Sequence, residues 1–278
     1  MLVSVFTPTH DPSNLTDAFH SLQKQNVPWE WVIVPNNISE TAIPAEIRNN
    51  PCVRVEPYAL GKQEEPKIGA LKRFACDNCR GDVFVELDHD DMLMPGVLPR
   101  VAERIDDGAD FVYSDAAVFS SEGEYVWPTT YSEDCGWESY EIRVFGRDLK
   151  ASRALDVTAP SLRETSYAPT RVPAWGHERH YKAGGHDPEL TVGDDHDLLC
   201  RTYLSGGRFA HTGSCGYLYR LHPGNTVKSH NAEIQERQAV TRDKYIRPLI
   251  GEWRKRHGLA LVRADEDQTV TITDGRMK

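Results

Sequence analysis

Short apolar runs alternate with stretches of helical periodicity through the first 120 residues of the chain. The runs are typical of buried strands, and they occupy residues 2–6, 31–34, 52–55, 82–87 and 110–114. Between the first two runs, apolar side chains recur one helical turn apart; they are Leu15, Ala18, Phe19 and Leu22. This order predicts an α/β fold in which helices flank a mostly parallel central sheet.

Two further helices are predicted, one on each side of the fourth strand. Their apolar faces consist of Ile68, Leu71, Phe74 and Ala75 in one helix and Val97, Leu98, Val101 and Ile105 in the other. Ser13 or Asn14 can cap the first helix of the chain, because short polar side chains accept hydrogen bonds from the free N–H groups of a helix start. Asp91 can cap the helix after the fourth strand in the same way.

The pattern changes after residue 120. Residues 121–175 carry tryptophans, tyrosines and prolines without clean periodicity, which favours an irregular functional loop region. A helical pattern resumes from 232 to 257, and the stretch DQTVTIT near the end alternates like one exposed strand.

The bulk composition narrows the class of protein. The chain has 278 residues, of which 39% are hydrophobic, enough for the core of one large α/β domain. Its net charge of −10 disfavours nonspecific attraction to phosphate backbones and anionic lipid surfaces. The sequence has no run of roughly 18 apolar residues and no signal-peptide pattern, so we expect a cytoplasmic protein without an integral membrane segment.

Cysteine and histidine spacing does not indicate a metal site. Six cysteines are spread along the chain, which predicts free thiols. Cys76 and Cys79 form a C-x-x-C pair inside a helical pattern, and no second close pair exists to complete a zinc site. The HERH stretch at 177–180 lacks the spacing of metalloproteases, and the glycine motifs of dinucleotide-binding, P-loop and hydrolase-elbow proteins do not occur.

Polar loops follow three of the predicted strands, at residues 7–11, 35–37 and 88–91. Ligands of open α/β sheets bind at the carboxyl ends of strands, so we expect these loops to converge at one edge. The third loop, DHDD, places like charges side by side, and these repel one another unless a cation lies among them. The Asp88-x-Asp90 pair therefore favours a site for a divalent cation and its diphosphate.

A second acidic cluster lies in GGHDPELTVGDDHDLLCR, residues 184–201. Gly184 and Gly185 permit positive φ angles or a close backbone approach. The apolar helix-like stretch that ends this segment is preceded by Asp194, Asp195 and Asp197. Capping of that helix accounts for one of the three aspartates, and three is more than capping needs. Further along, YRLHPGNT follows a strand-like CGYLY and contains Arg220 and His222.

The order of these motifs resembles that of the family 2 glycosyltransferases of the GT-A fold. The resemblance covers about residues 1–225 and rests on VSVFTPTHD, PKIGALKRFACDNCRGDVFVELDHDD, AGGHDPELTVGDDHDLLCR and YRLHPGNT. It implies an enzyme that transfers a sugar from a nucleotide diphosphate donor, most commonly a UDP-sugar, to an acceptor hydroxyl with inversion. It also implies Mn²⁺ or Mg²⁺ as cofactor, since a divalent cation stabilises the charge on the departing diphosphate.

The resemblance further implies roles for individual residues. The donor nucleotide would be bound by Thr7, Pro8, His10, Asn36, Asn37, Lys67 and Asp88. The metal ion would be held by Asp88, Asp90 and His222. Asp195, the second acid of the DDHD motif, would take the proton of the acceptor hydroxyl as general base. The acceptor is expected near Trp175, Gly184, Gly185 and Asp194, because aromatic faces stack on sugars and glycines admit a substrate closely.

The same resemblance divides the chain into a nucleotide-sugar-binding half, an acceptor-binding and catalytic half of the same domain, and a C-terminal helix with a tail, at 1–120, 121–230 and 231–278. One departure concerns the second strand, which ends in Pro35-Asn36-Asn37 where many family members have paired aspartates. An asparagine would then read the base, which leaves the choice between uridine, guanosine and thymidine open.

Other interpretations stay open at the level of sequence. One is a catalytically silent binding module for a nucleotide-sugar or glycan on the same scaffold. Another is a metal-dependent nucleotide-sugar hydrolase, and a third is a retaining transferase. The acceptor is undetermined among a protein, a glycan, a small molecule and a modified nucleobase, and a homo-oligomer is possible.

Overall fold

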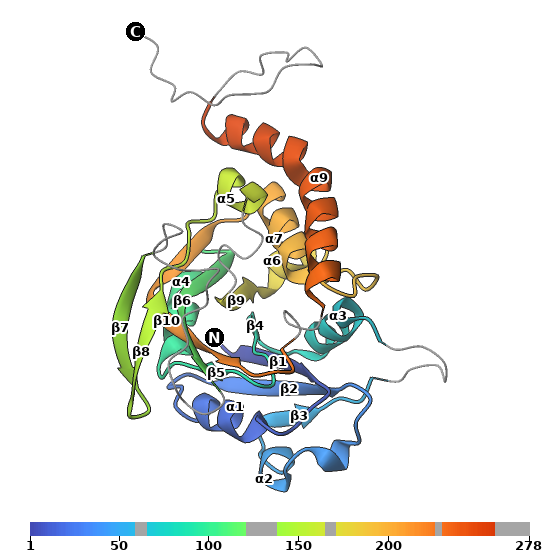
Figure 1. Cartoon of the computed structure of the whole chain (residues 1–278), viewed down its shortest axis with the longest axis vertical. Coiled ribbons are helices and arrows are strands. Elements are labelled where there is room, and N and C mark those ends of the chain that lie inside the picture. Colours follow the sequence, from blue (N-terminus) through green and yellow to red (C-terminus); the bar gives the residue numbers. More distant parts are fainter. Residues whose placement is uncertain (59–65, 121–137, 165–170, 226–229, 259–278) are drawn as a thin grey trace.

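A curled central sheet flanked by helices forms the body of the molecule (Figure 1). The computed structural model describes residues 1–58, 66–120, 138–164, 171–225 and 230–258. The strands are β1 (Val3–Thr9), β2 (Trp29–Pro35), β3 (Val53–Val55), β4 (Val83–Glu86), β5 (Met92–Leu93), β6 (Phe111–Ser120), β7 (Ser139–Val144), β8 (Arg147–Ser152), β9 (Arg171–Gly176) and β10 (Phe209–Leu221). The helices are α1 (Leu15–Leu22), η1 (Glu40–Ala42), α2 (Ala45–Arg48), α3 (Ile68–Asn78), α4 (Val97–Asp106), α5 (Ala159–Glu164), α6 (His177–Lys182), α7 (Asp194–Leu204) and α9 (Asn231–Arg256).

The strands of the sheet run in the order β3-β2-β1-β4-β9-β6-β10-β5. β1 is parallel to β2 and to β4, β2 is parallel to β3, and β6 is parallel to β10. β9 lies antiparallel between β4 and β6 and so joins the two parallel blocks. The predicted α/β fold is confirmed. Because β1, β2 and β4 are parallel neighbours, their carboxyl ends lie at the same edge of the sheet.

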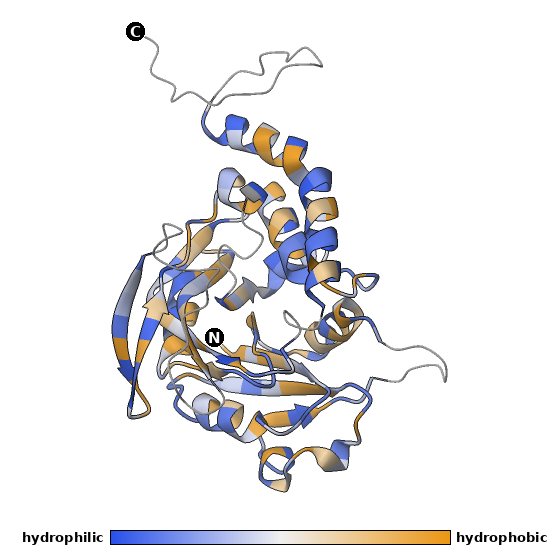
Figure 2. Cartoon of the chain, viewed as in Figure 1, coloured by the Kyte–Doolittle hydropathy of each residue, from blue (hydrophilic) through white to orange (hydrophobic). Residues whose placement is uncertain are grey.

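Hydrophobic residues are concentrated along the strands of the sheet (Figure 2), and many of them are buried. On β1, Val5 belongs to a cluster that includes Leu15 of α1, while its neighbour Phe6 packs with Leu71 of α3. Strands covered on both faces read as nearly continuous apolar runs rather than alternating ones. All five predicted strands are therefore present, as β1 to β4 and β6. The five cysteines among the described residues are free thiols, as predicted.

The three predicted helices of the N-terminal half are present as α1, α3 and α4, but their predicted caps are wrong. Asn14 precedes α1 without a side-chain capping bond, and Ser13 bonds to an aspartate two residues earlier. α4 follows Gly96, whose φ of 70° is left-handed. Asp91 is fully buried, and its Oδ1 accepts a hydrogen bond from the Arg220 N–H (2.7 Å). A contact distant in sequence has taken the place of the local cap.

Part of the stretch predicted to be irregular has regular structure. β7 and β8 form an antiparallel hairpin that joins β6, and β9 is an inner strand of the sheet. The sequence of β9, RVPAWG, contains a proline and ends in glycine, residues that normally argue against a central strand. Its pairing partners lie far away in the sequence, so the local pattern could not reveal it. Residues 121–137 lie outside the described residues.

The predicted C-terminal helix is present as α9, which extends away from the sheet (Figure 1). Tyr245 and Leu249 of α9 pack in a cluster with Leu162 of α5 and Tyr203 of α7. The DQTVTIT stretch, predicted as a strand, lies outside the described residues. Within the part of the chain that the structure describes, no helix combines the length and the apolar character needed to span a membrane.

Candidate active site

The loops after β1, β2 and β4 meet at one edge of the sheet, as predicted. The Asn36 N–H, just past β2, donates to the carbonyl oxygen of Thr9 at the end of β1 (2.7 Å). The rings of His10 and His89, which follow β1 and β4, meet edge to face with their centroids 4.8 Å apart. These contacts bring together three loops that are far apart in sequence.

Asn36 carries an unused hydrogen-bond acceptor at this edge. Its side chain is half-buried, and its Oδ1 is buried without a hydrogen-bond partner among the described residues. Leaving such an acceptor unpaired costs about 1–3 kcal/mol. Asn37 is exposed and has a positive φ of 57°, a conformation that asparagine tolerates better than most residues. Asn36 Oδ1 can therefore accept a hydrogen bond from an N–H group of a ligand.

The residues at the end of β1 differ in their access to this edge. Pro8 is half-buried and His10 is exposed; burial lowers the pKa of His10. Thr7 is fully buried, and its Oγ1 donates to the Leu87 carbonyl oxygen (2.6 Å) and accepts from Trp31 Nε1 (2.8 Å). The Thr7 hydroxyl therefore holds β1 to its neighbouring strands, and the predicted role of Thr7 in donor binding stays a prediction.

Lys67 lies directly before α3, at the helix N-terminus. Its Nζ contacts Glu189 Oε2 at 2.6 Å, in an ion pair whose side chains are 43% and 78% exposed. The pair connects the start of α3 to the loop before α7. Exposed ion pairs contribute little stability, so a phosphate can replace Glu189 at small cost.

The DHDD loop after β4 points its carboxylates in different directions. Asp91 is buried against β10, as described above, whereas Asp88 is half-buried and Asp90 lies close to it in the same loop. Burial raises the pKa of Asp88, and the charge of Asp90 raises it further. The repulsion expected from the sequence is thus present. Neighbouring carboxylates whose charges repel form the arrangement that a divalent cation stabilises.

His222 contacts the same acidic pair. Its Nε2 lies 2.7 Å from Asp90 Oδ2, and its Nδ1 accepts a hydrogen bond from the Gly224 N–H (3.2 Å). The proton on a neutral His222 therefore belongs on Nε2, which donates it to Asp90. His222 can bind a cation through Nε2 as the other neutral tautomer, in which the proton lies on Nδ1 and the Gly224 N–H contact is given up.

Arg220 holds the acidic loop in place from inside β10, not from a loop after it as its position suggested. Its side chain is 7% exposed. Nε donates to the Asp90 carbonyl oxygen (2.7 Å), Nη2 contacts Asp17 Oδ2 (2.6 Å), and the guanidinium lies 4.8 Å from the centre of the Phe119 ring. The sequence drew attention to Arg220, but its partners on α1 and β6 are visible only in the fold.

The three aspartates at the start of α7 have three different environments. α7 begins at Asp194, after Gly193 with a φ of 70°, so no aspartate takes the capping position. Asp197 is buried, and it contacts Lys244 and the Tyr245 hydroxyl of α9 at 3.0 and 2.8 Å. Asp195 is the least buried of the three, and its Oδ1 accepts from the next backbone N–H in the helix. Asp195 is thus the aspartate that a substrate can reach.

Asp194 belongs instead to a buried ionic cluster around Lys72 of α3. Lys72 Nζ lies 2.7 Å from Glu86 Oε1 and 3.2 Å from Asp194 Oδ2, and the three side chains are at most 9% exposed. Burial lowers the pKa of Lys72, but Asp194, Glu86, Asp195 and Asp88 outweigh it and leave the pKa well above its usual value. Burial raises the pKa of Glu86 to about 8. Because Asp194 is buried, its predicted role in acceptor binding is wrong.

The Lys72 cluster was missed by sequence reasoning. Lys72 is not among the residues of the predicted apolar helix face, and Glu86 falls within the strand predicted at 82–87. A glutamate at the last position of an otherwise apolar strand was the available signal, because a carboxylate is rarely buried without a partner. The cluster lies between the two acidic motifs, and both Asp88 and Asp195 act on its charges.

The other residues predicted on the acceptor side are Trp175, Gly184 and Gly185. Trp175 is 1% exposed, its ring packs against Phe111 and His186, and its Nε1 donates to Thr202 Oγ1 (3.3 Å). The prediction that Trp175 stacks on a sugar is wrong, because β9 places it in the core. Gly184 and Gly185 have φ angles of 93° and 64°, so the predicted positive φ is confirmed.

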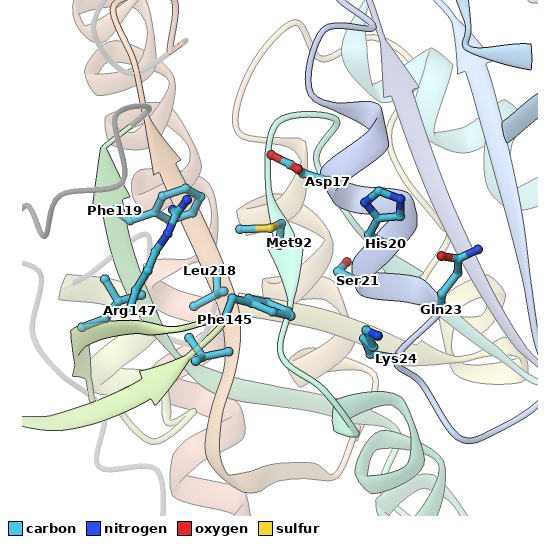
Figure 3. Close-up of a pocket in the computed structure, with 12 residues that line it drawn as sticks. Asp17, His20, Ser21, Gln23, Lys24, Met92, Phe119, Phe145, Arg147 and Leu218 are labelled. Atoms are coloured by element: carbon cyan, nitrogen blue, oxygen red, sulfur yellow. The ribbon is translucent and has the colours of Figure 1, made fainter. Parts of the chain in front are cut away.

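A pocket of about 390 Å³ lies beside this edge, between α1 and the β7-β8 hairpin (Figure 3). Figure 3 shows Asp17 and His20 of α1 on one side and Phe119 and Arg147 on the other. None of the predicted donor or metal residues lines it. Asp17 lines the pocket, and its carboxylate also contacts Arg220, which bonds to the backbone of the acidic loop.

The sequence matches known proteins in the region that builds this edge. The family model described as glycosyl transferase family 2 matches residues 4–160, more than half of the chain. Succinoglycan biosynthesis protein ExoO of Rhizobium meliloti (strain 1021) is 27% identical over 203 residues, which are 70% of this chain and 53% of that protein. The chain thus spans about half the length of this curated relative.

Similar folds occur among solved structures. S. aureus TarS 1–349 in complex with UDP-GlcNAc has a TM-score of 0.62 at 18% identity, over 92% of this chain and 73% of that chain. GalNAc-T7 with UDP, GalNAc and Mn²⁺ has a TM-score of 0.58 at 15% identity, over 80% of this chain and 44% of that chain. At these identities the likeness shows the fold alone. The protein therefore has the GT-A fold and belongs to glycosyl transferase family 2.

Proposed function

We propose that the protein is a metal-dependent glycosyltransferase that moves a sugar from a UDP-sugar to an acceptor hydroxyl with inversion at the anomeric carbon. One observation carries the proposal: the two acidic motifs, distant in sequence, meet at the same buried Lys72 cluster. Lys72 Nζ lies 2.7 Å from Glu86 Oε1, two residues before Asp88, and 3.2 Å from Asp194 Oδ2, next to Asp195. Inverting transfer needs a cation site for the leaving diphosphate and a base for the attacking hydroxyl, and the two motifs would supply one each.

The donor nucleotide would bind across the loops after β1 and β2. Asn36 Oδ1 would accept a hydrogen bond from the ring N–H of a base, which uracil, thymine and guanine carry and cytosine lacks. Pro8, His10 and Asn37 would line the nucleoside, and Lys67 would leave Glu189 for a phosphate. UDP is the first choice, because the solved structures of TarS and GalNAc-T7 with similar folds contain UDP-GlcNAc and UDP.

Asp88 and Asp90 would hold a Mn²⁺ or Mg²⁺ ion on the donor diphosphate. Two neighbouring carboxylates, with the charge of Asp90 raising the pKa of Asp88 and an imidazole 2.7 Å from Asp90, fit an oxygen-preferring divalent cation. The cation supplies Lewis-acid stabilisation of the leaving diphosphate. His222 would complete the ligand set through Nε2 as the neutral tautomer that carries its proton on Nδ1.

Asp195 would accept the proton of the acceptor hydroxyl. It is accessible at the start of α7, while its neighbours are bound elsewhere: Asp194 to Lys72, and Asp197 to α9.

The division of labour within the chain belongs to the same proposal. Residues 1–120 would bind the donor, 121–230 would bind the acceptor and carry Asp195, and 231–278 would form the C-terminal extension. Gly184 and Gly185 would shape the acceptor side through their backbone. The acceptor itself and the oligomeric state are left open, since the chain spans about half of its curated relative.

The metal platform can be tested by ligand-dependent unfolding. We expect UDP to raise the unfolding temperature of the wild type more with Mn²⁺ than without it, because a ligand of the native state stabilises it. Asp90→Asn should lower UDP affinity in Mn²⁺ by about 10- to 100-fold, the loss seen when even an outer partner of a metal ligand is removed. Asp107→Asn, an exposed aspartate after α4, is the control and should behave like the wild type. Full turnover in EDTA would remove the assigned role of Asp88 and Asp90.

Base recognition can be tested separately at Asn36. We expect Asn36→Leu to weaken UDP binding by about tenfold, the value of one hydrogen bond to a buried acceptor. Asn37→Leu, at the exposed neighbour, should have a smaller effect. Thermal-shift titrations with UDP, GDP, TDP and CMP would measure both variants. A wild type that responds equally to CMP would contradict recognition of a ring N–H by Asn36.

Turnover assays separate the competing functions. A hydrolase would release free sugar from the donor without an acceptor, and its rate would not rise when acceptor is added. A silent binding module would respond to UDP without any turnover. For a transferase, product stereochemistry by NMR would distinguish inversion from retention.

A further inference from the structure

A cysteine and two histidines from three separate segments converge in the core behind the active site. They are Cys76 in the last turn of α3, His180 in α6 and His186 in the loop before α7, and all three are fully buried. One ligand atom of each lies within 4.8 Å of the others. We propose that these three side chains form a structural Zn²⁺ site, distinct from the donor metal site at Asp88 and Asp90.

The hydrogen bonding of the two imidazoles supports a ligand between them. Both ring nitrogens of His180 lack a hydrogen-bond partner among the described residues, and so does Nε2 of His186. An unpaired buried polar group is costly, and native structures rarely keep one without a reason. Aromatic packing accounts for the His180 ring, whose centroid lies 5.3 Å from that of Phe84, but it leaves the nitrogens unused.

His186 also has the outer partner that metal-bound histidines require. Its Nδ1 lies 2.7 Å from Asp194 Oδ2. A carboxylate at one ring nitrogen fixes the tautomer, so the other nitrogen carries a lone pair and is more basic. Here that other nitrogen is the unpaired Nε2. With an ion bound at Nε2, the Asp194 carboxylate, His186 and the metal would follow one another in that order.

The local charges suit a divalent cation bound to one thiolate. When Zn²⁺ binds, the Cys76 thiol loses its proton to solvent, and the Zn²⁺ with one thiolate and two neutral imidazoles carries a single positive charge. The adjacent ionic cluster contains two carboxylates, Asp194 and Glu86, and one cation, Lys72. When Glu86 is ionised, the single excess negative charge of this cluster would balance the site.

The ligand types and spacing favour zinc. Thiolate and imidazole are ligands that Zn²⁺ prefers, with bonds of about 2.3 and 2.0 Å, which places tetrahedral ligand atoms about 3.3–3.6 Å apart. Small side-chain movements within the observed 4.8 Å would close this set. Sequence spacing does not indicate this site, because the C-x-x-C motif contributes only Cys76 and the histidines lie far along the chain.

Such a site would position the catalytic motif without touching the substrate. The ion would tie α3 to α6 and to the loop before α7, and through His186 it would hold Asp194. Asp194 is adjacent to Asp195, so the bound ion would fix the start of α7 where the base is proposed to act.

Cobalt substitution tests the proposal on the full chain without nucleotide. We expect metal-free protein to bind one equivalent of Co²⁺ with a thiolate-to-metal charge-transfer band, which carboxylate and imidazole ligands at the Asp88 site cannot produce. Zn²⁺ should displace the Co²⁺, abolish the band and raise the unfolding temperature. Cys76→Ala should lose the band, and His180→Gln and His186→Gln should lose or strongly weaken it.

Two matched variants control for other thiols and histidines. Cys79→Ser changes the second cysteine of the same C-x-x-C pair, and His177→Gln changes an exposed histidine one turn before His180. Both should keep the band and the response to Zn²⁺. A band that survives Cys76→Ala, or a folded wild type without either response, would overturn the site. Because the assay contains no donor, its failure would leave the proposed function untouched.

Discussion

Asp195→Asn is expected to lower the rate of sugar transfer by about 10²–10⁴-fold, the usual contribution of a general base. An amide cannot take the proton of the attacking hydroxyl, whereas the change in size is negligible. The UDP-dependent thermal shift in Mn²⁺ should stay close to that of the wild type, because Asp88 and Asp90 are unchanged. The measurement is UDP release with an acceptor to which the wild type transfers, alongside the thermal shift.

Asp197→Asn is the matched control for this prediction. Asp197 lies on the same helix but bonds to Lys244 and Tyr245 of α9, so its substitution should lower stability and leave the turnover of folded protein largely intact. If Asp195→Asn also removes the UDP response, Asp195 belongs with the metal ion or the fold, and the assignment of the base fails.

Lys72→Met is expected to lower the free energy of unfolding by about 3–5 kcal/mol, the loss observed when one partner of a buried ion pair is removed. Methionine fills a similar volume, but it leaves Asp194 and Glu86 buried without their cation. Denaturant unfolding at neutral pH measures the effect. Lys67→Met is the matched control: its partner Glu189 is 78% exposed, so the unfolding midpoint should stay close to that of the wild type.

The effect of Lys72→Met should depend on pH. Burial raises the pKa of Glu86 from 4.5 to about 8, so the folded state retains a proton that the unfolded state has released. A group with a raised carboxyl pKa therefore stabilises the fold less as the pH rises from 4.5 to 8. Without Lys72 this effect grows, because the ionised carboxylates are uncompensated. A deficit that is larger at pH 5 than at pH 8 would contradict the role assigned to the cluster.

The order of the strands decides which polar loops meet at the proposed active site. β1, β2 and β4 could be read from their apolar runs, and their parallel pairing brings Asn36 and His89 to one edge. β9 could not be read, because proline and glycine interrupt its pattern while its stability comes from hydrogen bonds to β4 and β6. The same strand places Trp175 in the core, where the sequence alone suggested a surface that binds sugar.

The sequence by itself determined the fold class and the two acidic motifs. Strand and helix periodicities are local properties, and carboxylates crowded after a buried strand already predict a cation site by their repulsion. Only the tertiary structure decided which of the three aspartates at the start of α7 is accessible. Asp194 is neutralised by Lys72 and Asp197 is bound to α9, so Asp195 alone of the three stays accessible. The physical reason is that burial and ion pairing depend on partners far along the chain, and local sequence holds no information about those distances.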